Sequence, residues 1–136
     1  MSTAKLTWAG AATFVASDTR GHSIVLDVKT EFGGNDAGVQ PLDLILFSLA
    51  GCMGYDIVSI LNKKRANLQR FTVEVDGDRA AEQPHRFTKL RLKFRANREV
   101  DQADIQRAFE LSRDKYCSAL ATLKTPPEFE FDVGTE

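Results

Sequence analysis

The segment from Pro41 to about Arg65 constrains the fold more than any other part of the chain. It predicts one long helix, because proline suits a first helical turn and the basic residues at 63–65 suit the negative end of the helix dipole. The apolar residues lie on most faces of that helix and not along a single stripe. They are Leu44, Ile45, Leu46, Phe47, Leu49, Met53, Ile57, Val58, Ile60 and Leu61. A helix of this kind must be surrounded by other elements.

The charged residues of this helix decide between a membrane span and a buried core. The segment contains Asp43 and Asp56. Asp56 would lie well inside a bilayer, at a cost of about 2.5–3.5 kcal/mol. A core helix is therefore favoured, and we expect no membrane partner. No apolar stretch typical of a signal peptide is visible at the N-terminus, so we expect a cytoplasmic protein, where a static disulfide is unusual.

Other strand-like and helical segments flank this helix in a definite order. Strands are predicted at about 4–8, 11–16, 22–29, 70–76, 89–95 and 129–133. In the segment 89–95 apolar and basic residues alternate strictly, which is the period of a sheet with one wet face. A second helix is predicted over 102–123, with Asp101 as its N-cap and Cys117 in its inner stripe.

The resulting order, βββ-α-ββ-α-β, does not interleave strands with helices one by one, so an all-parallel sheet is not expected. It predicts an α+β fold, with antiparallel sheets packed on two helices in a single domain over residues 1–136. These elements do not cover every face of the apolar helix. We therefore expect a second subunit to cover the rest, in a homodimer.

Charge and motifs exclude several classes of function. The chain carries 18 basic and 19 acidic residues, whereas a dedicated nucleic-acid binder has a basic surplus, so no nucleic-acid partner is expected. The sequence GGNDAG at 33–38 matches neither the P-loop nor the dinucleotide fingerprint, and it predicts a flexible loop. His22 and His85 lack ligand-like spacing, so neither a metal nor another cofactor is expected.

Cys52 and Cys117 are the only cysteines, and each lies in one of the two predicted helices. A thiolate can attack an O–O bond, and a second thiol can then convert the oxidised sulfur to a disulfide. Buried cysteines also serve as small apolar side chains, and position alone favours that interpretation. The helix neighbours of Cys52 are mostly apolar with one acid, Asp56, and this setting as a whole is expected to blunt the reactivity of the thiol. An activating cation must then come from elsewhere, and Arg20, at a predicted hairpin tip, is one candidate.

Two stretches of the chain resemble the OsmC/Ohr family. Residues 33–65 contain a glycine-rich loop, a proline, an acidic residue and an apolar run with a small residue before cysteine, as the first helix of that family does. The stretch KYCSALATL at 115–123 is similar to the second cysteine motif of the family. The order of elements matches as well, so the resemblance covers essentially the whole chain.

The resemblance implies a cysteine-based peroxidase that reduces organic hydroperoxides or hydrogen peroxide and is regenerated by an external thiol reductant. It also implies an intertwined homodimer with two sites at the subunit interface. By this resemblance Cys52 is the peroxidatic residue and Cys117 the resolving one. The arginine that assists the thiolate in the family corresponds best to Arg20.

The chain departs from the family at one site residue. The active branch has a glutamate ten residues before the first cysteine, where this chain has Leu42, and the acid here is Asp43. At about 100° per residue, a residue ten before the cysteine points within roughly 80° of it, and one nine before points about 180° away. Asp43 is therefore expected to stabilise the helix N-terminus. A ligand-binding or redox-sensing dimer, and a purely structural role for both cysteines, stay open beside the peroxidase.

Overall fold

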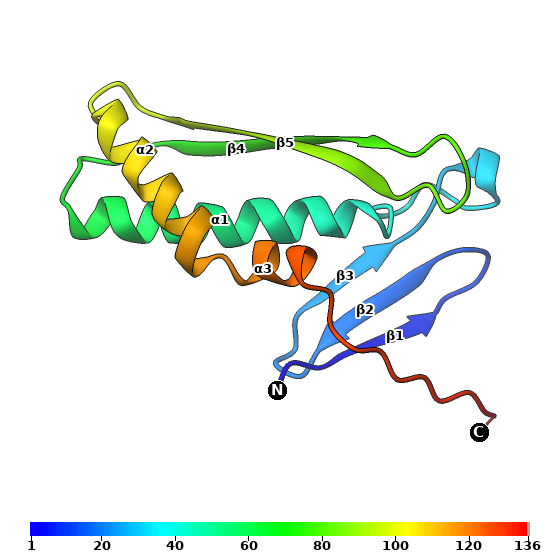
Figure 1. Cartoon of the computed structure of the whole chain (residues 1–136). Helices are drawn as coiled ribbons and strands as arrows, with labels where there is room; N and C mark the ends of the chain where they lie inside the picture. Colours follow the sequence, from blue (N-terminus) through cyan, green and yellow to red (C-terminus); the bar gives the residue numbers. More distant parts are fainter. Residues whose placement is uncertain (136) are drawn as a thin grey trace. The chain divides into compact units, whose positions relative to one another are not determined.

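The computed structural model describes residues 1–135, which form two compact units. The first unit is Met1–Phe47, and the second begins at Ser48. Helix α1 (Asp43–Lys63) starts in the first unit and continues through the second (Figure 1). In its described part the chain has an α+β fold with two antiparallel sheets and three α-helices. The α+β class and the antiparallel sheets were predicted from the order of the elements. The single domain over residues 1–136 stays a prediction.

Three strands form the sheet of the first unit, in the order β1 (Ala4–Trp8), β2 (Phe14–Asp18) and β3 (Ser23–Leu26), all antiparallel. The sequence predicted all three, but β2 begins later than expected. A tight turn precedes it, in which Ala11 has a φ of 46°, a conformation that no strand contains. The turn between β2 and β3 contains Gly21 at a φ of 91°, where glycine avoids the strain of a side chain.

Asp27 ties the loop after β3 to the sheet. Its side chain is fully buried and accepts hydrogen bonds from the Thr13 hydroxyl at 2.9 Å and from the backbone N–H groups of Val28, Asn35 and Ala37 at 2.7, 3.3 and 3.2 Å. Burial alone would raise the pKa of this carboxyl, but the hydrogen bonds outweigh it and hold the pKa below its usual range.

The glycine-rich loop is therefore held in place, and the prediction of a flexible loop is wrong. It contains a short 3₁₀ turn, Thr30–Phe32, and then passes close to the end of β3. A Cβ atom on Gly34 would lie 2.1 Å from the Val28 carbonyl oxygen, so only glycine fits there. The carboxylate of Asp27 needs this close approach to reach the loop N–H groups.

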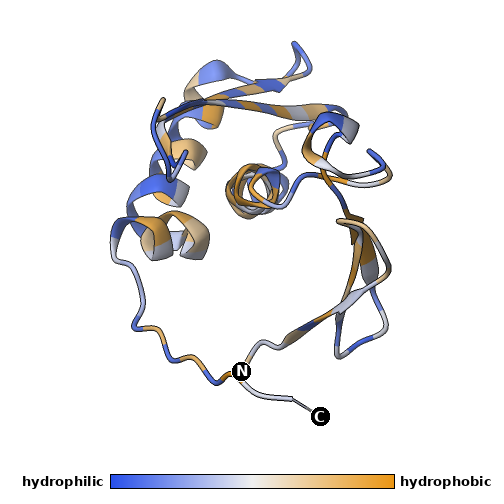
Figure 2. Cartoon of the chain, turned by 90° about the vertical axis from the view of Figure 1, so that its right-hand side faces the viewer, coloured by the Kyte–Doolittle hydropathy of each residue, from blue (hydrophilic) through white to orange (hydrophobic). Residues whose placement is uncertain are grey.

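Helix α1 is the centre of the second unit. Its buried residues recur every four positions at Leu49, Met53, Ile57 and Leu61, which places them in one stripe. The stripe packs on the sheet formed by β4 (Phe71–Arg79) and β5 (Phe87–Ala96) and on the helices that follow (Figure 1). Seen along its axis, α1 is apolar around most of its circumference, as the sequence predicted (Figure 2).

By length and composition alone, α1 is apolar enough to cross a membrane. Core helices of soluble proteins satisfy the same criteria. The expectation of no membrane partner stays a prediction.

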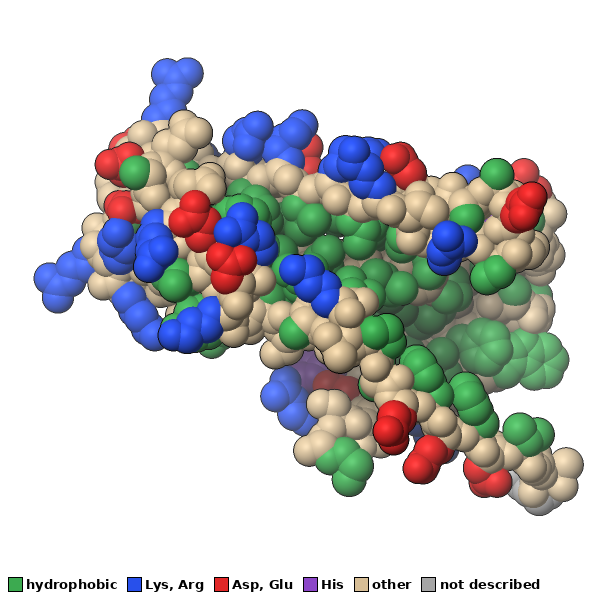
Figure 3. Space-filling view, in the orientation of Figure 1, with side chains coloured by type: hydrophobic (Ala, Val, Ile, Leu, Met, Phe, Trp, Pro, Cys, Tyr) green, Lys and Arg blue, Asp and Glu red, His purple; other side chains and the backbone are tan. Residues whose placement is uncertain are grey.

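The β4–β5 hairpin has one apolar and one charged face, which confirms the predicted alternation. Its charged face carries ion pairs from Arg91 to Asp76 and Asp78, at 2.6 and 2.7 Å. The hydrogen bond from Arg91 is the main cause that holds the pKa of Asp78 below its usual range. Charged side chains follow this sheet in Figure 3, and hydrophobic side chains gather over α1 beside it. The apolar face of the hairpin therefore covers one side of the helix.

The predicted second helix, 102–123, is wrong in its continuity. Helix α2 runs over Gln102–Leu111, with Asp101 as the expected N-cap accepting from the Ala103 N–H at 3.0 Å. A π-helical turn, Ser112–Tyr116, follows it, and Cys117 is extended, with φ −74° and ψ 102°. The third helix, α3, then covers Ser118–Lys124. The wide turn interrupts the helix because the Cys117 N–H donates to the carbonyl five residues earlier.

The strand predicted at 129–133 is also wrong. These residues have no regular secondary structure, and Phe129, Phe131 and Val133 are 70%, 87% and 94% exposed. Alternation supplies the side-chain pattern of a strand, but a strand also needs a neighbour to pair its backbone groups. In residues 1–135 no strand pairs with this segment.

Candidate thiol site

The structure brings Cys52 and Cys117 together in the second unit. Both are free cysteines, and they contact each other in a cluster with Leu49 and Met53. Cys117 is only 5% exposed, whereas Cys52 is half-buried. Cys52 is therefore the more exposed of the two residues.

The position of Cys52 on α1 explains its partial exposure. It precedes Met53, a member of the buried stripe, by one residue, so it lies beside the stripe and not at its centre. Leu90, Leu92 and Phe94 of β5 also pack against the cluster. The environment of Cys52 is thus mostly apolar, as its sequence neighbours predicted.

The break between α2 and α3 determines the position of Cys117. Its backbone N–H donates to the Ser112 carbonyl at 2.9 Å, and its Sγ accepts from the Leu120 N–H at 3.3 Å. The thiol therefore occupies the N-cap of α3, where an extended residue turns its side chain toward the start of the helix. The sequence placed Cys117 inside a continuous helix and missed this arrangement.

A polar contact lies next to the two thiols. Asp56, one turn after Cys52 on α1, accepts a hydrogen bond at 2.7 Å from the hydroxyl of Ser112, which is fully buried. Asp56 was expected as a helix neighbour of Cys52, but its hydrogen-bond partner was not predicted from the sequence. The available signal was a serine within the inner stripe of the predicted second helix.

The surroundings of Cys117 disfavour its ionised form. Burial raises the pKa of its thiol, and the neighbouring Cys52 raises it further, whereas the N–H groups of Leu120 and Ala119 act in the opposite direction with a smaller effect. Cys117 is therefore a protonated thiol at neutral pH. Such a thiol is a poor first nucleophile for a peroxide.

Basic residues in the π-helical turn have other partners. Arg113 forms an ion pair with Asp114 at 2.6 Å, and its guanidinium lies 5.2 Å from the centre of the Phe109 ring. The Lys115 ammonium lies 5.6 Å from the centre of the Tyr116 ring. These contacts engage the cations that are closest to Cys117 along the chain.

Arg20 and Asp43 belong to the first unit. Arg20 lies in the turn between β2 and β3, as predicted, where its backbone N–H donates to Asp18 Oδ1 at 2.8 Å. Its action on the Cys52 thiol stays a prediction. Asp43 is the first residue of α1, so its negative charge lies at the positive end of the helix dipole.

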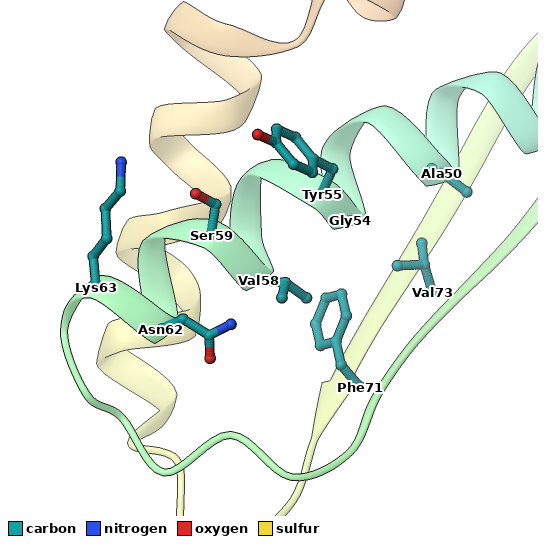
Figure 4. A pocket seen from close by; sticks show the side chains of 10 residues that line it. Ala50, Gly54, Tyr55, Val58, Ser59, Asn62, Lys63, Phe71 and Val73 are labelled. Atoms are coloured by element: carbon teal, nitrogen blue, oxygen red, sulfur yellow. The ribbon is translucent and has the colours of Figure 1, made fainter. Parts of the chain in front are cut away.

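A groove of about 830 Å³ follows α1 beside β4 (Figure 4). Its apolar wall includes Gly54, Val58, Phe71 and Val73, and polar side chains line its outer end. The polar residues are Ser59, Asn62 and Lys63. Within residues 1–135, no three His, Cys, Asp or Glu side chains are grouped to hold a metal ion.

Comparisons with known proteins agree with this fold. Residues 33–132 match the family described as OsmC-like protein. Protein YhfA of Escherichia coli is 32% identical over 122 residues, which cover 89% of this chain and 88% of YhfA. A crystal structure of a hypothetical protein from Aquifex aeolicus is similar with a TM-score of 0.80 and 28% identity, covering 93% of this chain and 89% of that one.

One peroxide-related protein is a more distant match. The organic hydroperoxide resistance protein OsmC from Legionella pneumophila has a TM-score of 0.64 and 18% identity, over 92% of this chain and 90% of that chain. At this identity the similarity extends to the fold alone.

Proposed function

Because this chain belongs to the OsmC-like protein family, we propose that it is a cysteine-based peroxidase that reduces organic hydroperoxides. The observation that carries the proposal is the contact between a half-buried thiol, Cys52, and a buried thiol, Cys117, in one apolar cluster. Structural cysteines have no need of a second thiol in contact. A peroxidatic cysteine benefits from one, because a nearby thiol converts its sulfenic acid to a disulfide before over-oxidation.

Two steps on the protein complete the reaction. The Cys52 thiolate attacks the terminal oxygen of the hydroperoxide, the O–O bond breaks, and the substrate leaves as an alcohol once it takes up a proton. Cys52 is then a sulfenic acid. The Cys117 thiol condenses with it, which forms the S–S bond and releases water. An external dithiol reduces that disulfide and becomes oxidised itself.

The roles follow from exposure and pKa. Cys52 is assigned the first attack because it is the more exposed of the two cysteines, and Cys117 the second step because burial raises the pKa of its thiol. Leucine, methionine and phenylalanine side chains around the pair favour an apolar substrate over hydrogen peroxide. Arg20 is proposed, from the family resemblance, as the cation that favours the Cys52 thiolate.

A homodimer is part of the proposal. The groove beside α1 is apolar and open, and Tyr55 on its rim is 74% exposed. Phe47 on the same helix is 55% exposed. A groove lined by apolar side chains and flanked by exposed aromatic residues is typical of an interaction site, and a second copy is the proposed cover. The expected state in solution is two chains, each with its own pair of cysteines.

A second candidate function is binding of a small apolar ligand in the α1–β4 groove, with slow thiols. The groove volume of about 830 Å³ and the polar residues at one end, Asn62 and Lys63, favour it. Such a ligand would carry an apolar body and a polar or anionic end. This candidate predicts ligand binding that survives replacement of both cysteines.

Consumption of cumene hydroperoxide in the presence of dithiothreitol separates the two functions. The wild type should consume the peroxide over many turnovers, and Cys52→Ser should abolish consumption. Cys117→Ser should complete about one turnover and then stop or over-oxidise. Ser118→Ala, an exposed change beside Cys117, is the matched control and should keep the wild-type rate. Equal consumption by the wild type and Cys52→Ser would remove the peroxidase proposal.

A further inference from the structure

The hydrogen bond between Asp56 and Ser112 links the two segments that carry the cysteines. Asp56 lies one helical turn after Cys52 on α1, on the same side of the helix. Its Oδ2 accepts from Ser112 Oγ at 2.7 Å. Ser112 is the first residue of the π-helical turn and is fully buried. This hydrogen bond therefore fixes the start of the turn that ends at Cys117.

Ser112 also holds the backbone of Cys117. Its carbonyl oxygen accepts from the Cys117 N–H at 2.9 Å across the π-helical turn. Two hydrogen bonds thus connect the Asp56 carboxylate, Ser112 and Cys117 in sequence. Because Asp56 and Cys52 lie on the same face of α1, this connection sets the position of one thiol relative to the other.

The second hydrogen bond of Cys117 does not supply this link. Its Sγ accepts from Leu120, which lies in α3 and moves with Cys117 itself. Buried polar contacts that cross between elements restrict their relative position more than local ones do, because losing them leaves a buried group without a partner. Asp56–Ser112 thus joins α1 to the start of this turn, separately from the contact between the two thiols at its end.

We propose that Asp56 and Ser112 are positioning residues for disulfide formation between Cys52 and Cys117, a step that rests on the function proposed above. They act through the backbone of Cys117 and raise the effective concentration of its thiol at Cys52. In exchange with oxidised dithiothreitol, each of the two protein thiols loses one hydrogen. The S–S bond forms in the protein, the S–S bond of the reagent breaks, and the reagent gains both hydrogens.

The test measures the equilibrium between thiols and disulfide in mixtures of reduced and oxidised dithiothreitol, with alkylation and intact mass as the readout. Asp56→Ala and Ser112→Ala should each lower the equilibrium constant about tenfold, because each removes the same charge-assisted hydrogen bond. The double variant should lower it by about the same factor as either single one. Asp56→Asn keeps an oxygen acceptor and should stay within about threefold of the wild type.

Asp104→Ala is the matched control. Asp104 on α2 forms an ion pair with Lys64, next to the end of α1, so it also joins these helices, but far from the cysteines in sequence. It should leave the equilibrium constant within about twofold of the wild type. Circular dichroism checks that each variant is folded. If Asp56→Ala does not fold, Asp56→Leu takes its place, because leucine has a similar size but no hydrogen-bond acceptor. Asp56→Leu should show the same tenfold decrease of the equilibrium constant.

Three results would overturn the proposal. The first is an equilibrium constant for folded Asp56→Ala that lies within twofold of the wild-type value. The second is a decrease of the equilibrium constant in Asp104→Ala that equals the decrease in Asp56→Ala. The third is a wild type that forms no Cys52–Cys117 disulfide at any ratio of oxidised to reduced dithiothreitol. The assay contains no peroxide, so it is separate from the peroxidase test. A protein that forms the disulfide but does not consume cumene hydroperoxide removes the peroxidase proposal and leaves this one standing.

Discussion

Replacing Ile57 by alanine tests how the helix that carries Cys52 is held. Ile57 is fully buried, in a core cluster with Leu61, Val100 and Ala108, which come from α1, the segment before α2, and α2 itself. Truncation leaves a cavity between packed elements that cannot easily move together. Substitutions of this kind cost about 2–5 kcal/mol. With a fully buried side chain, the expected loss in the free energy of unfolding is about 3–4 kcal/mol.

The assay is urea unfolding followed by far-UV circular dichroism. With an m-value of about 2 kcal/mol/M, the midpoint should fall by about 1.5–2 M while the m-value stays the same. Leu123→Ala is the control, since Leu123 on α3 is 44% exposed, and it should change the free energy of unfolding by less than about 0.5 kcal/mol. A loss below about 1 kcal/mol for Ile57→Ala would refute the assignment of this residue to the core.

Three further predictions concern charge and assembly. Because the folded pKa of Asp27 is lowered, its contribution to stability is full above the unfolded value of about 3.9 and is lost as pH falls through the folded value. In Asp27→Asn that part of the acid dependence should disappear from unfolding curves measured between neutral pH and pH about 3. Alkylation rates against pH should give Cys117 a pKa above that of an ordinary thiol, and Cys52→Ala should lower it, because the Cys52 thiol is one cause of the shift. Val58→Glu, which places a charge in the α1–β4 groove, should convert a dimer to a monomer in light scattering, whereas a wild type that is already monomeric would contradict the proposed partner.

The long helix and most strands could be predicted because their patterns are local. Apolar residues on most faces of 44–61 predict a helix that other elements cover, and strict alternation in 89–95 predicts a sheet with one charged face. Asp101 was predicted as an N-cap from its position alone, and it accepts the expected backbone hydrogen bond. Such features depend on neighbours within one or two turns of the chain.

The parts that the sequence did not predict depend on distant partners. The π-helical turn begins at Ser112, whose buried hydroxyl donates to Asp56. The one local signal of this contact was a serine in the apolar stripe of 102–123, and it did not identify the partner on the other helix. The loop at 33–38 was expected to be flexible, because its own residues show no element that would hold it. The carboxylate that holds it belongs to Asp27, which precedes the loop in a strand-like segment. The final strand failed for a related reason, since alternation at 129–133 does not provide a neighbouring strand.

The contact between Cys52 and Cys117 was accessible to the sequence only through the family resemblance. Their positions in two predicted helices were compatible with core cysteines that never meet. The structure adds the contact itself, the burial of Cys117 and the hydrogen bonds that hold it. These observations give the two cysteines different exposure and different hydrogen-bond partners, and the roles proposed above rest on that difference.

The most direct test of the central claim is the intact mass of the protein after one equivalent of cumene hydroperoxide, with free thiols blocked by alkylation. The wild type should lose two hydrogen atoms and resist alkylation at Cys52 and Cys117, because both sulfurs are in one disulfide. Cys117→Ser should instead gain one oxygen atom on Cys52, as a sulfenic acid. Two alkylated thiols in the treated wild type, or oxygen found first on Cys117, would contradict the account.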